Sequence, residues 1–241
     1  MKVAVFVVAL LALSVAGKKH HAVPDKLNMC PICISLMTDA QNELIQIAAN
    51  GGVVGGCSAL CGMLKNSLEA DACGLVCDYV GITAFSDALN YIDPDPVFTC
   101  MLMDVCAKTN DASAELHEMK LDPVTGPVGT HFDLTVEWNT TSPLATGMLE
   151  VAINGGQISG LGSSQMVYGQ AEGLYKAKFS FDTKPTNDNA WADGTYAVTF
   201  ALCEGSCGST HAYSYTVLEN TLGFILNSTQ GADVFDYHLY L

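Results

Sequence analysis

Hydrophobic residues in the first half of the chain recur at the spacing of an amphipathic helix. The clearest run places five apolar residues on one helical face: Ile34, Met37, Leu44, Ile45 and Ala48. The same period predicts helices near five segments: 28–49, 55–67, 71–80, 83–91 and 97–108. Glycine pairs precede the second segment, and Asp-Pro-Asp-Pro at 93–96 breaks the chain before the last. We therefore expect the first half to be a helical module.

The period changes to two in the second half. Apolar and polar residues alternate over four runs: 132–138, 175–181, 196–202 and 213–217. Gly-rich turns such as 154–156 separate these runs, as in antiparallel sheets. Tyr196, preceded by Asp-Gly-Thr, resembles the tyrosine corner of immunoglobulin-like domains. We expect two domains, with an all-β immunoglobulin-like sandwich over 121–241 joined to the helical module by a polar linker at 109–120.

An apolar run at the N-terminus predicts a secretory signal peptide over residues 1–17. Lys2 precedes an uncharged stretch that ends in small residues suited to cleavage after Ala16 or Gly17. The stretch is shorter than the roughly 20 residues of a spanning helix, so an uncleaved anchor is the weaker alternative. We expect a secreted, extracellular protein with disulfides. Two sequons, at Asn139 and Asn227, are candidate glycosylation sites on that route.

The charge composition excludes one class of partner. The 241 residues include 25 Asp and Glu against 10 basic residues, which gives a formal net charge of −15. All 10 basic residues are Lys, so the chain has no Arg. It therefore lacks the guanidinium groups that form bidentate hydrogen bonds with phosphates and base edges. We therefore expect no nucleic acid partner.

Cysteine spacing is the most specific signal in the first half. Eight of the 10 Cys lie between residues 30 and 106. Six of these are separated by 2, 27, 11, 26 and 5 residues, a spacing similar to that of the saposin B-type domain. The resemblance implies an all-α, disulfide-stapled helical module over 26–108. It also implies three bonds: Cys30–Cys106, Cys33–Cys100 and Cys61–Cys73.

Helix geometry places the other two cysteines of this region. Cys57 lies one turn before Cys61, and Cys77 lies one turn after Cys73. If the inner pair faces each other across a helical hairpin, Cys57 and Cys77 also meet. A fourth bond, Cys57–Cys77, is therefore predicted.

The last two cysteines, Cys203 and Cys207, lie between two predicted strands. Three residues that include Gly205 separate them, so a bond between them fixes the tip of a hairpin. A structural bond is favoured over a redox site, because the spacing is not Cys-x-x-Cys. All ten cysteines are then paired.

No motif in the sequence indicates catalysis. The run 160–164 lacks the G-x-S-x-G order of hydrolases, and His117-Glu118 lacks the second His of a zinc protease. We therefore predict that the chain is not an enzyme and has no catalytic residue, cofactor or metal site. Metal binding by the cysteines is a weaker alternative, as is Cu(II) binding by His20 after cleavage at Gly17.

Four short strings spread over both halves resemble the countin family. They are residues 77–82, 93–96, 126–130 and 203–209. The family comprises secreted cell-counting proteins of social amoebae and their relatives. The resemblance implies an extracellular signalling factor that works in a larger complex and regulates cell adhesion, motility and group size. It also implies other secreted or cell-surface proteins as partners.

Two other functions stay open at this point. The saposin resemblance implies a lipid-binding or membrane-perturbing effector, with lipid as a partner. Ten acids and three Lys between Asp25 and Lys108 give this region a net charge of −7. Contact with anionic membranes is therefore expected at acidic pH, where carboxylates are protonated. A hydrolase or a hydrolase accessory is the third function.

Overall fold

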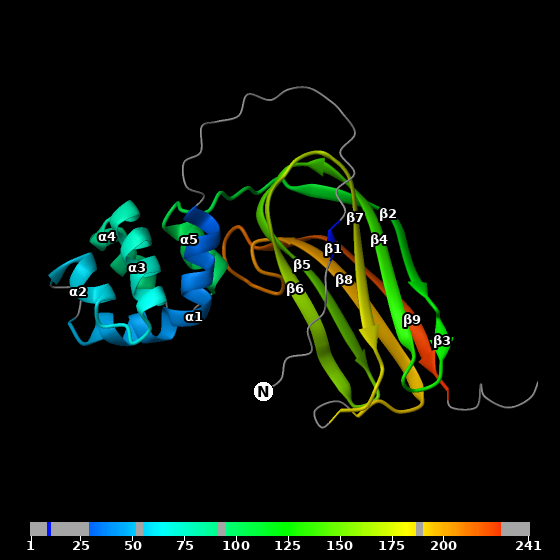
Figure 1. The fold of residues 1–241 in the computed structure, drawn as a ribbon. Coiled ribbons are helices and arrows are strands. Elements are labelled where there is room, and N and C mark those ends of the chain that lie inside the picture. The colour runs from blue at the N-terminus through cyan, green and yellow to red at the C-terminus, as the bar shows by residue number, and fades with distance from the viewer. Residues whose placement is uncertain (1–8, 11–28, 52–54, 91–94, 187–189, 228–241) are drawn as a thin grey trace, which may run out of the picture.

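The computed structural model describes residues 9–10, 29–51, 55–90, 95–186 and 190–227. Helices form the first part of this chain and strands the second, and the two parts lie side by side (Figure 1). The described helices are α1 (Met29–Ala49), α2 (Cys57–Cys61), α3 (Ser67–Val80), α4 (Ile82–Leu89) and α5 (Pro96–Leu102). The predicted signal peptide, residues 1–17, lies outside the described residues except for the two-residue strand β1 (Ala9–Leu10).

Local sequence sets several helix ends. Asn66 caps α3, because its side chain accepts a hydrogen bond from the backbone N–H of Leu68 at 3.0 Å. Asp95 caps α5 in the same way, with bonds of 2.9 and 3.1 Å. Gly81, with φ of 85°, separates α3 from α4, which are bent by 113°. No single described helix is long and apolar enough to cross a bilayer, although this bent pair meets the test by length and composition.

The expectation of an all-α, saposin-like module is wrong. Within the described chain, strands cover more residues than helices. Three of the five described helices are very short, because α2, α4 and α5 have 5, 8 and 7 residues. The first half is therefore not a clear all-α saposin domain but a set of mostly short helices connected by turns.

Disulfide closure explains why two helices end early. The helix expected over 55–67 ends at Cys61, where the chain reverses to close the bond with Cys73. The helix expected over 97–108 ends at Leu102. Beyond Leu102 the chain is no longer helical, and Cys106 forms a disulfide with Cys30 at the start of α1. At α2 the local sequence acts in the same direction, because Gly62, a poor helix former, directly follows Cys61.

The second part of the chain consists of two facing sheets (Figure 1). Their longer strands are β2 (Ser113–Asp122), β4 (His131–Ser142), β5 (Leu144–Gly155), β6 (Ile158–Gln170), β7 (Gly173–Asp182), β8 (Gly194–Glu204) and β9 (Tyr215–Leu226), with a short β3 (Thr125–Gly126). One sheet has the order β1-β7-β4-β2 and the other β3-β9-β8-β5-β6. Among the described strands, all pairs are antiparallel except β3 with β9.

Strand β2 occupies most of the segment expected to be a linker, 109–120. It begins at Ser113 and pairs with β4 along its length. It is the outer strand of its sheet, and nearly all of its side chains are exposed or half-buried. An edge strand of this kind lacks the regular burial of alternate residues that reveals the other strands in the sequence.

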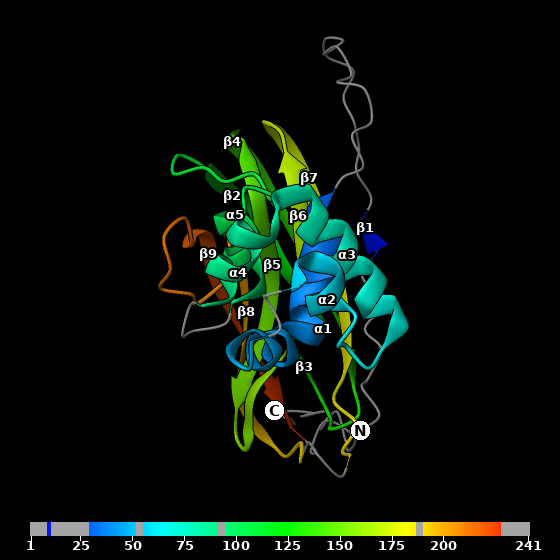
Figure 2. The same cartoon turned by 90° about the vertical axis from the view of Figure 1, so that its left-hand side faces the viewer.

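Two separate cores form in the described chain. The first unites side chains of α1 to α5 with the cysteines, and the second fills the space between the sheets. The hydroxyl of Tyr196 donates to the carbonyl of Ala192 at 2.8 Å, which is the kind of backbone contact that a tyrosine corner makes. From the second half, Met166 and Tyr213 pack against the first core. Viewed from the helical side, the helices lie in front of the strands (Figure 2).

Candidate functional site

Five disulfides connect the described chain, with the pairing that the sequence predicts. They are Cys30–Cys106, Cys33–Cys100, Cys57–Cys77, Cys61–Cys73 and Cys203–Cys207. No cysteine of the described residues is free. Two of the bonds join α2 to α3, one helical turn apart on each helix. The position of α3 therefore does not depend on burying all of its apolar side chains.

Helix α3 has two apolar faces. One face belongs to the first core. On a neighbouring face Leu68, Leu75 and Tyr79 are 76%, 53% and 59% exposed, and half-buried Ala72, which also packs against the first core, lies between them. We call these four residues the α3 stripe. Large apolar side chains that are grouped and exposed in this way mark contact surfaces.

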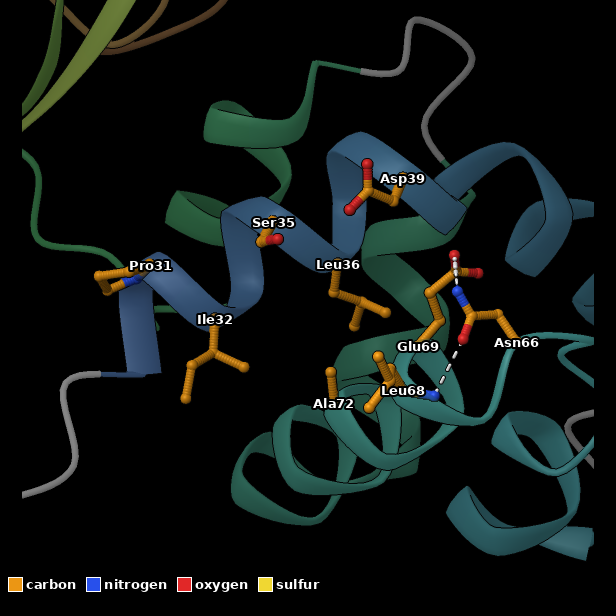
Figure 3. Close-up of a pocket in the computed structure, with 9 residues that line it drawn as sticks. All are labelled: Pro31, Ile32, Ser35, Leu36, Asp39, Asn66, Leu68, Glu69 and Ala72. Atoms are coloured by element: carbon orange, nitrogen blue, oxygen red, sulfur yellow. Dashed lines mark hydrogen bonds between the residues drawn. The ribbon is translucent and has the colours of Figure 1, made fainter.

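A groove runs between α1 and α3 along one side of the α3 stripe (Figure 3). Its volume is about 480 Å³. It is lined by Pro31, Ile32, Ser35, Leu36, Asp39, Asn66, Leu68, Glu69 and Ala72. Ile32 and Ala72 contribute apolar surface, while Asp39 and Glu69 lie toward the same end of the groove (Figure 3). Glu69 accepts a hydrogen bond of 2.8 Å from the side chain of Asn66, which orients its carboxylate.

A second groove lies between α2 and α3, on the other side of the α3 stripe. Its volume is about 540 Å³. It is lined by Ser58, Cys61, Gly62, Ala70, Asp71, Gly74, Leu75 and Asp78. Asp71 and Asp78 are exposed and seven residues apart, so they lie on the same side of α3. The α3 stripe is therefore flanked by carboxylates on both sides.

The lysines of this region are engaged elsewhere. Lys65 lies 3.9 Å from Glu43, and Lys108 lies 2.6 Å from Asp104. In the described part of residues 29–108, no lysine forms an ion pair with the carboxylates of α3. The surface around the α3 stripe is therefore apolar and acidic at neutral pH.

The loop between β8 and β9 contacts α5 where the two halves of the chain meet (Figure 1). The rings of Phe98 and His211 are stacked, with centroids 4.2 Å apart. The hydroxyl of Ser206 donates to the carboxylate of Asp95 at 2.8 Å. The local disulfide closes the start of this loop. The loop thus holds α5 by a ring contact and a charge-assisted hydrogen bond.

Glu204 is a buried carboxyl group beside this loop, with no exposed surface. One of its oxygens accepts hydrogen bonds from the backbone N–H groups of Thr109 and Thr146 at 3.1 and 3.3 Å. The other accepts from Ala145 at 3.0 Å. Burial raises the pKa of Glu204, the three backbone donors oppose that rise, and nearby Asp111 adds to it. Glu204 therefore ties the segment that leaves the first half to strand β5.

One exposed cluster contains catalytic residue types without catalytic geometry. His131 lies 3.0 Å from Asp182 and 3.5 Å from Asp133. The hydroxyl of Ser180 donates to Asp133, so it is not positioned against the imidazole as a nucleophile. Hydrogen bonds from Ser180 and Lys178 lower the pKa of Asp133. Among the described residues, no group of three or more side chains is arranged to hold a metal ion.

The two candidate glycosylation sites lie in the second half. Asn139 is exposed on β4. Asn227 follows β9, and the remaining residues of its sequon lie outside the described chain. Glycosylation of both residues remains a prediction.

The sequence analysis missed the α3 stripe and Glu204. Leu68, Leu75 and Tyr79 are separated by seven and four residues, a spacing that is visible in the sequence. The buried face of the same helix is also apolar, however, so the spacing alone does not show which face is exposed. Glu204 could have been noticed as a charged residue at the end of the apolar run of β8, where a buried carboxyl group needs hydrogen-bond donors.

Comparison with known proteins indicates one family across both halves. A model of the Countin N-terminal domain matches residues 28–104, and a model of the Countin C-terminal domain matches residues 114–231. The chain is 35% identical to Countin-3 of Dictyostelium discoideum over 197 residues, which cover 82% of this chain and 89% of that protein. It is 33% identical to Countin-1 of the same organism over 215 residues, which cover 89% and 82%.

Two solved structures resemble the chain weakly. The alkylpurine DNA glycosylase AlkC of Pseudomonas fluorescens has a TM-score of 0.36 and 11% identity, with coverage of 79% of this chain and 46% of that one. A CARDB domain of Pyrococcus furiosus has a TM-score of 0.30 and 13% identity, with coverage of 48% and 92%.

Proposed function

This chain belongs to the countin family, and on that premise we propose that it is a secreted factor that regulates cell adhesion, motility and group size through protein contacts. The five disulfides support the extracellular part of the proposal, because such bonds persist in oxidising compartments. The α3 stripe supports the contact part, because it presents apolar side chains to solvent on a helix that two disulfides hold in place.

Group size in a developing cell population tests this proposal. The full chain is expressed in Dictyostelium discoideum and purified from the medium. We expect recovery outside the cells and a dose-dependent change in group size when the oxidised protein is added to fresh cells. Protein reduced and alkylated beforehand serves as the control and should be inactive. Retention inside the cells, or equal group sizes with and without the oxidised protein, contradicts the proposal.

Processing on the secretory route is part of the proposal. Cleavage after Ala16 or after Gly17 is expected to leave a mature chain whose N-terminal sequence begins at Gly17 or at Lys18, respectively. Glycans are proposed at Asn139 and Asn227. Edman sequencing and enzymatic deglycosylation of the secreted protein measure both, with N139Q and N227Q as controls for the two sites.

Lipid binding is the second candidate function, and the exposed α3 stripe is the observation that favours it. Carboxylates flank these side chains, so approach to an anionic bilayer is opposed at neutral pH and eased when the carboxylates are protonated. Flotation with anionic vesicles at about pH 7 and about pH 4.5 separates the two candidates. Binding confined to the lower pH supports lipid contact, and no binding at either pH leaves the protein-contact function alone.

A further inference from the structure

We propose that the α3 stripe is a docking surface for a basic amphipathic helix of a partner protein. The inference rests on the proposed function, because it specifies the partner through which protein contact is made. It depends on three features of the described residues: the period of the stripe, the carboxylates that flank it and the grooves on either side of it.

The α3 stripe has the period of a helix–helix seam. Its residues Leu68, Ala72, Leu75 and Tyr79 are separated by four, three and four positions. This alternation is that of the a and d positions of a heptad, which face a partner helix in coiled coils. Leu68, Leu75 and Tyr79 are exposed, so a partner can reach the seam without displacing any element of the described fold.

The flanking acids occupy the positions that select a partner. In the heptad defined by the α3 stripe, Asp71 and Asp78 fall at successive g positions, and Glu69 falls at an e position. Residues at e and g form ion pairs across a helix–helix seam and determine which partners are accepted. Since no described lysine pairs with these acids, their natural complements are Lys or Arg side chains on the incoming helix.

The same charges oppose two other occupants. In an antiparallel pair with a second copy of this chain, g positions face g positions, so Asp71 and Asp78 would face carboxylates. In either orientation a second copy offers these acids no basic side chain from α3, and each chain carries a formal net charge of −15. An anionic membrane surface is repelled for the same reason. Among a second copy, a membrane and a basic helix, only the basic helix satisfies both the apolar and the charged parts of this surface.

The grooves on both sides of the α3 stripe provide space for side chains of a partner helix. The groove of about 480 Å³ between α1 and α3 and the one of about 540 Å³ between α2 and α3 lie on opposite sides of the α3 stripe. Side chains of a helix laid on the stripe can enter them, as knobs enter holes in coiled coils. With its 14 residues, α3 is about 21 Å long, which accommodates two heptads of a partner.

Two designed peptides test the inference on the full secreted chain. Both are amphipathic helices of about 21 residues with Leu at a and d, and they differ only at e and g, where one has Lys and the other Glu. Fluorescence anisotropy measures their binding. We expect the Lys peptide to bind at least about tenfold more tightly than the Glu peptide, with a smaller difference at about 1 M salt.

Three variants assign the binding to this surface. L75S should weaken binding of both peptides by about tenfold, because it removes an apolar contact at the centre of the seam. The double variant D71K/D78K should reverse the preference in favour of the Glu peptide. D87K on α4 adds the same kind of charge change away from the seam, and it should leave the preference unchanged. Circular dichroism and disulfide mapping confirm that each variant is folded.

Several outcomes would overturn the inference. Equal binding of the two peptides, or an unchanged preference in D71K/D78K, excludes charge-selected docking on this face. A dimer in sedimentation experiments that L75S dissociates assigns the surface to a second copy. Flotation with neutral phosphatidylcholine vesicles at about pH 7 that L75S abolishes assigns it to lipid.

Measuring both peptide binding and the effect on group size distinguishes failure of the docking inference from failure of the proposed function. If the Lys peptide is preferred but L75S retains full activity on cells, the docking surface stands and its proposed use in signalling fails. If no peptide preference is found and the wild-type chain still changes group size, the docking inference fails and the proposed function stands.

Discussion

Glu204 shows how one buried carboxyl group connects the two halves of the chain. It has no exposed surface and accepts three backbone hydrogen bonds, one of them from Thr109 in the segment between the halves. A buried carboxylate with several backbone donors is held in place, but it is costly to ionise. Removing Glu204 therefore takes away the acceptor of three backbone N–H groups at once.

Replacing Glu204 tests this role at the residue scale. E204A should lower the free energy of unfolding by about 3 kcal/mol, because it removes the acceptor of one buried and two part-buried backbone N–H groups. E204Q keeps one acceptor oxygen and should cost less. Urea unfolding measures both, and E219Q on the exposed face of β9 is the matched control. A loss in E204A no larger than in the control contradicts the role.

Acidity should stabilise the wild type through the same group. Burial raises the pKa of Glu204 above its ordinary value of 4.5, so the folded state takes up a proton at a higher pH than the unfolded state. The contribution of Glu204 to the free energy of unfolding therefore rises as pH falls through the raised pKa toward 4.5 and declines as pH rises. Comparing the wild type with E204Q at about pH 7 and about pH 5 isolates this contribution. If the difference in free energy of unfolding between the wild type and E204Q does not change with pH, Glu204 does not have a raised pKa.

Disulfides determine helix lengths at the scale of elements. The sequence predicts five helices in the first half, and the starts of α3 and α5 follow local caps at Asn66 and Asp95. The end of α2 at Cys61 coincides with Gly62, a poor helix former that follows it directly. The prediction of a helix to residue 67 gives more weight to Met63, Leu64 and Lys65, and it lacks the disulfide that joins Cys61 to a cysteine 12 residues away.

The candidate surface shows the same limit. The spacing of Leu68, Leu75 and Tyr79 could be recognised in the sequence, as could the acids between them. Which side of α3 is buried depends on how the α2–α3 disulfides orient the helix against α1. Exposure of the α3 stripe was therefore not predictable from the period alone, because both faces of the helix are apolar.

Removing the outer of the two α2–α3 disulfides should loosen α2 without unfolding the chain. The double variant C57A/C77A opens a loop with a sequence separation of 20 residues, and the inner bond remains. Loop entropy predicts a loss of about 3 kcal/mol, with faster hydrogen exchange in α2. The matched variant C203A/C207A opens a separation of only 4 residues, so it should cost less and affect the β8–β9 loop instead. Faster exchange spread over both halves in C57A/C77A contradicts this localisation.

At the scale of the whole molecule, the two halves have separate cores and a narrow shared contact. The described core of the first half draws on the second half through Met166 and Tyr213, and the ring of Phe98 stacks on His211. Four of the five disulfides close within the first half. Each half therefore has its own means of stabilisation, and the contact mainly fixes α5.

Residues 26–108 expressed alone in an oxidising host should fold with their four disulfides, but with a less stable α5. The fragment retains the first core and loses the ring contact with His211. Hydrogen exchange in α5 should be faster than in the full chain, and H211A in the full chain should give an intermediate rate. H117A, which changes an exposed His on β2, is the control. A fragment without helical circular dichroism contradicts the separate core.

The bond between Cys30 and Cys106 also decides how the molecule bears a pulling force. It joins the start of α1 to the segment that leads into β2, with Cα atoms 4.7 Å apart. Tension applied between the two ends of the described chain passes through this bond and not through the helices. In single-molecule stretching, the oxidised protein should lengthen only by unfolding its sheets, whereas reduction should release a further separation of 76 residues, about 260 Å of extended chain. On a cell surface under strain, the α3 stripe would keep its shape while the strands carried the load.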